Sequence, residues 1–330
     1  SPGSVCFDDI SLSKTVPPDK NTATKIEKPL SAKTSAEYGE CRVSDFPPRQ
    51  TWYLPDMPKQ LALDLTLPPD ANGTVTVSLL STDGKLLKSE TIKGKNSAIF
   101  GLPELDQGAY ILKYQAGSYL DEEVFRIADA QDKNKGIRFT NDHRAYFNGK
   151  PFFPIMVMSP KMEEDAFRIY REAGFNCIAP SFLTNDLQAG KAIADIAGKY
   201  DLLCATWLGI GDRCQALGPE KFKSFMAQHI KAARAMPNFF GFLDDESEMR
   251  EVSPIAMKQA YKEAFLTAPE FVIWQNHAPR MLGKSGQKYG NFDNVKRFTA
   301  ACDVSGVDIY PVPEGNFHSE LENKTLSCVG

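Results

Sequence analysis

Long apolar segments are missing from this 330-residue sequence. A helix needs about 20 consecutive apolar residues to cross a bilayer, and because no run approaches that length we expect no membrane span. Positive charge is not in excess either, since 38 Lys and Arg stand against 42 Asp and Glu, a formal charge of −4. Without a basic stripe or an RNA-binding aromatic motif, nucleic acid is not an expected partner. Nothing in the sequence indicates an oligomeric state.

Metal-binding and nucleotide-binding motifs are also missing. The four histidines form no HExxH motif, the seven cysteines form no CxxC or Cys/His pattern, and no glycine-rich phosphate loop occurs in the α/β region. We therefore expect no metal and no other cofactor. Cys177 and Cys204 lie inside apolar runs, which predicts core positions. Cys6 and Cys41 could pair if the protein is exported.

The first fifty residues contain little that could form a core. Residues 5–12 read as one isolated strand, which cannot bury its own face, and neither an initiator Met nor a signal peptide precedes it. We expect the sequence to start inside a longer protein. In residues 13–50, Lys, Thr, Ser and Pro dominate, which predicts a linker.

Residues 51–130 carry the short alternating runs that are typical of β-strands. A hairpin turn is expected at residues 82–85, and the pattern as a whole predicts a small β-sandwich. The strand-like runs are 61–67, 74–80, 110–114 and 123–127.

From residue 131 to 330, predicted strands alternate with amphipathic helices. The first helix is expected to begin at Ser159 with Pro160 in its first turn and to end at Gly174. Repeated βα units predict a parallel sheet with helical crossovers. Six units fit, whereas a closed barrel takes about 250 residues, so the predicted fold class is multidomain β plus α/β: a β-sandwich followed by an incomplete (β/α)8 barrel. The expected strands are 153–158 (buried), 175–179, 202–207, 239–243, 271–274 and 304–310, and the later helices end at 199, span 219–236 and begin at 253.

The fourth of these strands ends in a cluster of carboxylates: Asp244, Asp245, Glu246 and Glu248. Four acids within five residues repel one another, so the cluster must be exposed, bind a cation or take part in chemistry. In a parallel α/β barrel this is how a strand delivers an acid to the rim of the active site. The alternative is a solvated helix N-terminus, where the helix dipole favours acids. Alternation along the strand would send Asp245 and Glu246 to opposite faces.

Four motifs resemble the barrel of family 2 glycoside hydrolases and related sugar-cleaving enzymes. They are YFNGKPFFP at 146–154, AGFNCI at 173–178, PNFFGFLDDE at 237–246 and CDVSGVDIYP at 302–311. Residues 5–12 are similar to the closing strand of a jelly-roll carbohydrate-binding module, and residues 51–130 to the immunoglobulin-like domain that often precedes such barrels.

This resemblance implies a glycosidase that acts on a poly- or oligosaccharide, with Glu246 as its general acid/base. A carboxyl crowded by other carboxylates can hold the proton that the leaving oxygen needs. In a retaining mechanism a second carboxylate about 5–5.5 Å away attacks the anomeric carbon, and in this clan it comes from a seventh strand, which the chain does not contain. Asp245 and Ser247 stand where many members have Asn and Pro. The resemblance also implies a secreted or periplasmic location.

Other residues at the expected rim could bind the sugar. Trp207 and Trp274 close strands three and five and could stack on a sugar ring, with barrel packing as the alternative. Asn276 and His277 follow Trp274 and could bind hydroxyls at the same rim. Tyr310, at the end of strand six, could orient a carboxylate, with a structural role as the alternative.

Two other functions fit the same sequence. One is a protein that binds polysaccharide without cleaving it. The other is a metal-dependent barrel enzyme in which Asp244, Asp245 and Glu248 hold a divalent cation. In all three cases we expect an exposed apolar seam along strands one and six, because the closing strands are absent.

Overall fold

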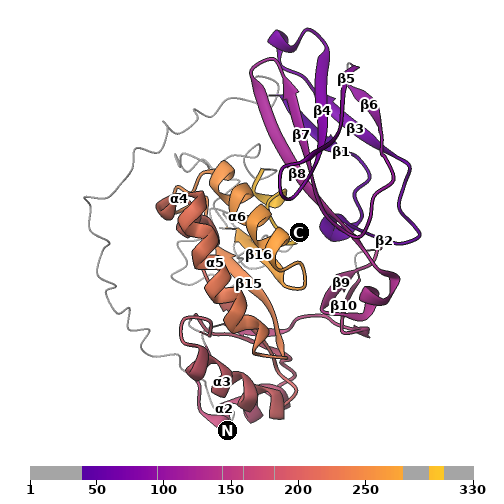
Figure 1. Cartoon of the computed structure of the whole chain (residues 1–330). Helices are drawn as coiled ribbons and strands as arrows, with labels where there is room; N and C mark the ends of the chain where they lie inside the picture. The colour runs from indigo at the N-terminus through magenta and orange to yellow at the C-terminus, as the bar shows by residue number, and fades with distance from the viewer. Residues whose placement is uncertain are drawn as a thin grey trace, which may run out of the picture.

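A computed structural model describes residues 39–94, 96–142, 144–158, 160–181, 183–277 and 297–307. Within these residues a β-rich part lies beside an α/β part, and a short hairpin region lies between them (Figure 1). The predicted strand at 5–12, Cys6, the helix start at Ser159 and the site residue Tyr310 lie outside the described residues. No helix in the described part is both long enough and apolar enough to cross a membrane.

The β-rich part consists of two sheets that share one core. The first has the order β1-β3-β6 and the second β2-β8-β7-β4-β5. Alternate residues face inward, so that Leu61, Leu63 and Leu65 of β3 are buried while their neighbours are not. The strands are β1 (Glu40–Val43), β2 (Thr51–Tyr53), β3 (Gln60–Thr66), β4 (Thr74–Ser81), β5 (Leu86–Lys93), β6 (Ser97–Gly101), β7 (Gly108–Ala116) and β8 (Tyr119–Ala128), and a 3₁₀ helix, η2 (Pro69–Ala71), precedes β4.

The segment expected to be a linker up to residue 50 contains two elements of this part. β1 pairs with β3 in antiparallel register, and the 3₁₀ helix η1 (Pro48–Gln50) leads into β2. Cys41 and Val43 of β1 face the core. The prediction of a linker is therefore wrong from residue 40, because a four-residue strand with two apolar positions is too short to stand out in a polar, proline-rich stretch.

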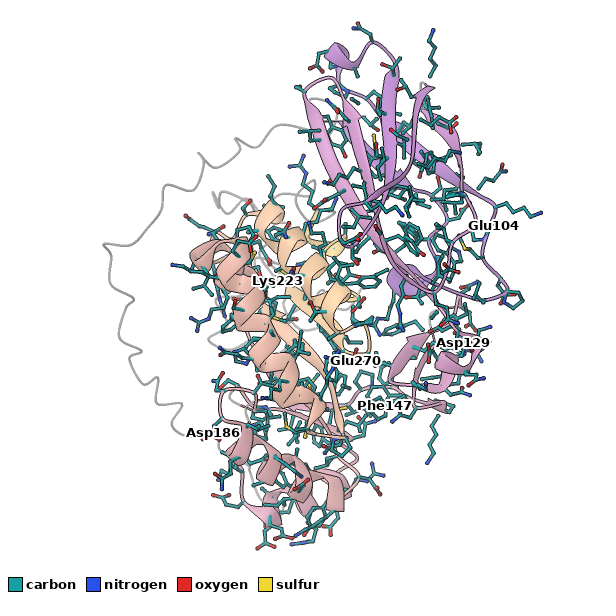
Figure 2. The ribbon with its side chains drawn as sticks, viewed as in Figure 1. Glu104, Asp129, Phe147, Asp186, Lys223 and Glu270 are labelled. Carbon is teal, nitrogen blue, oxygen red and sulfur yellow. The ribbon has the colours of Figure 1, made fainter. Side chains whose placement is uncertain are left out.

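A hairpin region connects the two parts. It consists of η3 (Ala130–Asn134), β9 (Ile137–Phe139), β10 (Ala145–Phe147) and β11 (Lys150–Pro151). Asn148 and Gly149, with φ of 47° and 77°, form the two-residue turn between β10 and β11. Figure 2 shows Phe147 of this region near Glu270 of the α/β part; Gly136 at its start lies so close that an added Cβ would be 3.0 Å from the Glu270 carbonyl oxygen.

The α/β part is a curled parallel sheet of six strands that pair in chain order. A doubly wound sheet would reverse that order, so this arrangement is part of an α/β barrel, as predicted. The strands are β12 (Met156–Met158), β13 (Cys177–Ala179), β14 (Leu203–Trp207), β15 (Phe239–Asp245), β16 (Val272–His277) and β17 (Val304–Val307), and the helices are α2 (Glu164–Glu172), α3 (Leu187–Lys199), α4 (Ile210–Leu217), α5 (Pro219–Arg234) and α6 (Pro254–Thr267).

The two faces of this sheet bury different cores. Cys177 and Leu243 belong to an inner cluster that includes aromatic residues of the hairpin region. Cys204, Phe242 and Ile273 belong to the outer cluster, which the helices cover. The prediction that Cys177 and Cys204 are core residues is confirmed, and burial raises the pKa of the Cys204 thiol to about 12.

The sequence predicted several helix ends but missed one helix and two starts. Ser253 caps α6 and Gly174, with φ of 93°, follows α2, as predicted, whereas the start of α3, which Asp186 caps (Figure 2), was not predicted. α2 begins at Glu164 rather than at Pro160, since Glu163 still has an extended backbone with φ of −77° and ψ of 142°. α4 was not predicted, since it is a short helix directly before α5 and only a glycine separates the two.

The first strand of the sheet is not buried as predicted. β12 lies at the edge of the described sheet and pairs only with β13 there. Phe153, Ile155 and Met158 are consequently 78%, 47% and 43% exposed. Apolar side chains are therefore exposed at the end of this strand and in the residues just before it.

A buried arginine ties the β-rich part to the α/β part. Arg49 donates from Nη2 to the carbonyl of Phe271 at 2.8 Å and from Nη1 to that of Ile137 at 3.0 Å. Its Nε lies 3.3 Å from Asp303 Oδ1 as an ion pair without hydrogen-bond geometry, and the two side chains are 7% and 1% exposed. Asp303 also accepts from the Tyr261 hydroxyl at 2.9 Å. One side chain thus contacts the hairpin region and the starts of β16 and β17.

A second set of contacts joins β8 to α6. Lys258 lies 2.5 Å from Asp121, and Lys262 pairs with Glu122. The next residue, Glu123, is half-buried and accepts from the Tyr114 hydroxyl at 2.6 Å; desolvation raises the pKa of its carboxyl to about 7.

Arg49→Met should lower the free energy of unfolding by about 3–5 kcal/mol, because it leaves the buried Asp303 carboxylate without its cation. Equilibrium urea denaturation measures this. Arg42→Met is the matched control, since Arg42 is 59% exposed and pairs only at the surface, and it should cost less than about 1 kcal/mol. Equal losses in the two variants would contradict the role of the buried pair.

Candidate functional site

The carboxyl ends of β15 and β16 bring the carboxylate cluster together with the residues predicted to bind sugar. Asp245 is in register with Asn276, and Asp244 with Gln275. Because side chains alternate along a strand, Asp245 and Asn276 lie on the inner face with Leu243 and Trp274. At the same ends of these strands, the side chains of Asp244, Gln275 and His277 lie on the outer face.

On the inner face, Asp245 is held from two sides. Asn276 Nδ2 donates to Asp245 Oδ1 at 2.9 Å, and Arg250 Nη2 lies 3.5 Å from Asp245 Oδ2. Arg250 also pairs with Asp212 of α4 through Nη1 at 3.0 Å. A connected network of Asn276, Asp245, Arg250 and Asp212 therefore fixes the carboxylate that precedes Glu246.

Glu246 stands where strand β15 stops. Its φ is +45°, and its N–H donates to the Asn276 carbonyl at 2.8 Å. Its own carbonyl accepts from the N–H groups of Met249 and Arg250, so the chain turns here. A left-handed conformation costs a non-glycine residue on the order of 1 kcal/mol. Because strand geometry ends at Asp245, the alternation that was expected to separate Asp245 from Glu246 does not extend to Glu246.

Asp244 is fully buried on the outer face. Its Oδ2 accepts from the N–H of Gly211 at 2.8 Å and its Oδ1 from the N–H of Asp245 at 2.9 Å. Gly211 lies in the first turn of α4, where the helix dipole favours negative charge. Burial nevertheless outweighs these donors and raises the pKa of the Asp244 carboxyl to about 6.

Glu248 and His277 lie together on the same outer side. They are 1% and 2% exposed, and Glu248 Oε2 is 3.6 Å from His277 Nδ1. The His277 ring also packs near Phe298. The expectation that His277 shares a rim with Asn276 is wrong, because consecutive strand residues point to opposite faces. Ser247, also buried, donates to Gln275 Oε1 at 3.3 Å.

The two tryptophans lie on the inner face. Trp207 ends β14 as predicted, whereas Trp274 does not end its strand, because β16 continues to His277. Trp207 and Trp274 are both in register with Leu243, pack against the inner cluster and are half-buried. Gly306 leaves space for the second indole, since an added Cβ would be 2.7 Å from Trp274 Nε1. Each indole thus packs partly against the inner cluster and is partly exposed to solvent, on a strand next to Leu243.

The three carboxylates proposed as metal ligands do not converge. Asp245 lies on the inner face, whereas Asp244 and Glu248 are buried on the outer one. In the described part of the chain, no group of three or more His, Cys, Asp or Glu is arranged to hold a metal ion. The arrangement therefore gives the metal-dependent alternative no support.

Sequence reasoning missed Arg250 and Asp212. Arg250 could have been found from the sequence as a cation four residues after Glu246. Nothing in the sequence marked Asp212 as part of the site, because helix α4, which carries it, was not predicted. Among the other histidines, His229 is buried, with Nδ1 2.8 Å from Thr184 Oγ1, which fits a structural role.

No protein-family profile matches this sequence, and no curated protein does. Solved structures with some similarity include the apo β-glucuronidase from Ruminococcus gnavus, with 11% identity over 77% of this chain and 46% of that chain and a TM-score of 0.37. Another is a glycosyl hydrolase family 2 member from Bacteroides cellulosilyticus, with 14% identity over 76% of this chain and 36% of that chain and a TM-score of 0.35. The chain thus spans less than half the length of either protein. A likeness of this extent carries no argument about the fold or the site of this chain.

The buried Asp244 carboxyl should make stability depend on pH. Its pKa is about 6 in the folded protein against 3.8 as the ordinary value, so between these values the folded state keeps a proton that the unfolded chain releases. The free energy of unfolding should therefore fall as the pH rises from 4 to 6, by at most about 3 kcal/mol.

Denaturation of the wild type and of Asp244→Asn at pH 4, 5, 6 and 7 isolates this contribution, because Glu123 titrates in both proteins and cancels. The wild type should lose stability relative to the variant across this range. A difference that stays constant with pH would contradict the assignment.

Proposed function

We propose that this chain is part of a glycoside hydrolase that acts on a poly- or oligosaccharide, with Glu246 as its general acid/base. The observation that carries the proposal is the position of Glu246. It directly follows the fourth parallel strand, at the carboxyl end where barrel enzymes place their chemistry, and its backbone is fixed to β16 in a conformation that costs energy. Two indoles and an Asp–Asn pair lie on the inner face beside it.

The reaction we propose is a retaining double displacement. Glu246 gives a proton to the oxygen of the departing sugar while a second carboxylate attacks the anomeric carbon, and Glu246 then takes a proton from the water that releases the product. That nucleophile would come from a seventh strand, outside these 330 residues. The complete protein would be secreted or periplasmic, with an immunoglobulin-like fold for the β-rich part.

The Asp245–Asn276 pair supports sugar binding despite the departure from the usual sequence. Most members of the clan have Asn before the acid/base, whose amide can donate to a sugar hydroxyl. Here Asp245 can only accept, but Asn276 lies 2.9 Å away on the next strand and carries an amide. We infer that Asn276 contributes the donor and Asp245 the acceptor, with Arg250 balancing the charge of Asp245.

The two half-buried indoles support a pyranose ring as the ligand. Trp207 and Trp274 lie on either side of Leu243 in the sheet register. The apolar face of a sugar packs on an aromatic ring, while its hydroxyls need the polar partners that Asp245 and Asn276 offer. The substrate would therefore lie over β14 to β16.

Glu246→Gln in the full-length protein should lower kcat/KM at least about 100-fold on aryl glycosides with poor leaving groups, because the departing oxygen loses its proton donor. On dinitrophenyl glycosides the loss should be much smaller, since that leaving group needs no proton. Steady-state kinetics over a panel of aryl glycosides measures both values.

Glu251→Gln is the matched control, since Glu251 is an exposed acid five residues further on. Added azide should restore turnover of the dinitrophenyl substrate by Glu246→Gln and yield a glycosyl azide. Unchanged turnover, or the same loss for good and poor leaving groups, would rule out Glu246 as the acid/base.

A further inference from the structure

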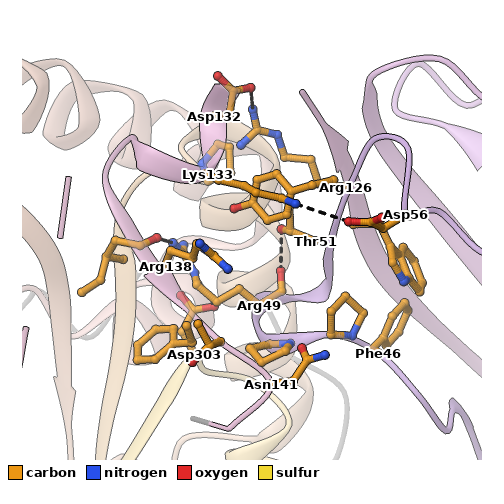
Figure 3. A pocket seen from close by; sticks show the side chains of 18 of the residues that line it. Phe46, Arg49, Thr51, Asp56, Arg126, Asp132, Lys133, Arg138, Asn141 and Asp303 are labelled. Carbon is orange, nitrogen blue, oxygen red and sulfur yellow. Dashed lines mark hydrogen bonds and ion pairs between the residues drawn. The ribbon is translucent and has the colours of Figure 1, made fainter. Parts of the chain in front are cut away.

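A cavity of about 1180 Å³ lies between the β-rich part and the α/β part (Figure 3). Its walls come from η1 and β2, from the η3 and β9 segments, and from the residues just before β16 and β17. Glu270 and Asp303, which line it, precede their strands, whereas Glu246 follows β15. The cavity is therefore at the opposite end of the sheet from the candidate active site.

Basic side chains gather around one aromatic ring in this cavity. Lys133 Nζ lies 5.5 Å and Arg138 Cζ 6.0 Å from the centre of the Tyr53 ring. Arg126 lines the same space (Figure 3). Tyr53 and all three cations are half-buried, so their charges are less screened than those of surface side chains.

The acids that line the cavity leave this positive charge only partly balanced. Asp132 is shared, since Arg126 lies 3.7 Å and Lys135 2.9 Å from it. Lys133 pairs with Asp56, whose side chain is 71% exposed. An ion pair with an exposed partner contributes little free energy, because water screens it. Arg138 has no ion pair with any carboxylate in the described part of the chain.

The remaining acids have other partners or are exposed. Asp303 pairs with Arg49 and Glu270 with Arg234. Asp142 is exposed and pairs with Arg144, and Asp45 is exposed. Among the half-buried cations around Tyr53, Arg138 is thus the one whose charge no carboxylate of the described residues pairs with.

We propose that this cavity binds the acidic group of a saccharide, a carboxylate or a sulfate ester, on Arg138 beside Tyr53. A guanidinium pairs with either group through two parallel N–H donors. The cavity is large enough for an oligosaccharide, and Phe46, Phe139 and Asn141 in its walls offer the aromatic and amide groups that sugar rings and hydroxyls require. Because Tyr53 belongs to the β-rich part and Arg138 to the hairpin region, the ligand would bridge the two. The site does not depend on Glu246.

Isothermal titration calorimetry on the chain tests this with trigalacturonate for the carboxylate, neocarrabiose sulfate for the sulfate ester, neutral cellotriose and inorganic sulfate. We expect at least one acidic saccharide to bind, more weakly as NaCl is raised, and cellotriose not to bind. Arg138→Met should weaken binding at least tenfold. Arg42→Met, which removes an exposed arginine of β1 that does not line the cavity, should leave the affinity unchanged, as should Glu246→Gln.

Lys133→Met should weaken binding at least threefold and provides a second variant if Arg138→Met does not fold. The proposal is overturned if neither acidic saccharide binds, if cellotriose binds as tightly, or if the arginine variants weaken binding equally. Inorganic sulfate that binds as tightly as the saccharides would indicate an adventitious ion only. Loss of binding in Glu246→Gln would place the ligand at the other end of the sheet and would also overturn it.

Discussion

The contact on which the arrangement of this protein depends is the buried pair of Arg49 and Asp303. Arg49 reaches the carbonyl of Phe271, which is 222 positions away in the sequence, while Asp303 accepts from the N–H of Ile273 at 2.9 Å. A buried ion pair gains little over a well-packed apolar pair, but it is costly to break and it demands a defined geometry. Because both charges are satisfied by backbone groups of specific strands, they position the β-rich part against the starts of β16 and β17. The carboxyl end of β16, together with that of β15, then holds the candidate site.

The parallel sheet divides the carboxylate cluster into groups with different physical properties. Asp245 stays on the inner face with a cation and an amide beside it, whereas Asp244 is removed from water and accepts from the N–H of Gly211 at the start of α4 and from that of Asp245. Glu248 is buried with His277 behind the strands. Charges that would repel strongly if they shared one space are therefore distributed over both faces of a single strand and its following turn. Glu246 occupies the turn, where the regular strand geometry has ended.

Local sequence signals predicted the parts of the fold that depend on neighbours in the chain. The end of the first helix at Gly174, the Ser253 cap and the order of six parallel strands all follow from short patterns. The strand β1 was missed because its two apolar residues are buried only once β1 pairs with β3, a contact that the local sequence does not indicate. The Arg49 contact could not be predicted, since nothing near Arg49 in the sequence marks its distant partners. His277 is a different case: alternation from Trp274 already places it opposite Asn276, so this error came from treating a strand end as a loop.

The positive φ of Glu246 connects the fold to the proposed chemistry. Had the strand continued, the residue after Asp245 would have pointed outward beneath the helices, where Asp244 and His277 are buried. The chain turns at Glu246 instead, and the hydrogen bond from its N–H to the Asn276 carbonyl offsets part of the conformational cost. Asn276 therefore contacts both residues: its carbonyl accepts from the backbone N–H of Glu246, and its amide donates to the side chain of Asp245. A substitution of Asn276 would remove only the second contact, whereas the first depends on the backbone of β16, which makes this strand the element that organises the site.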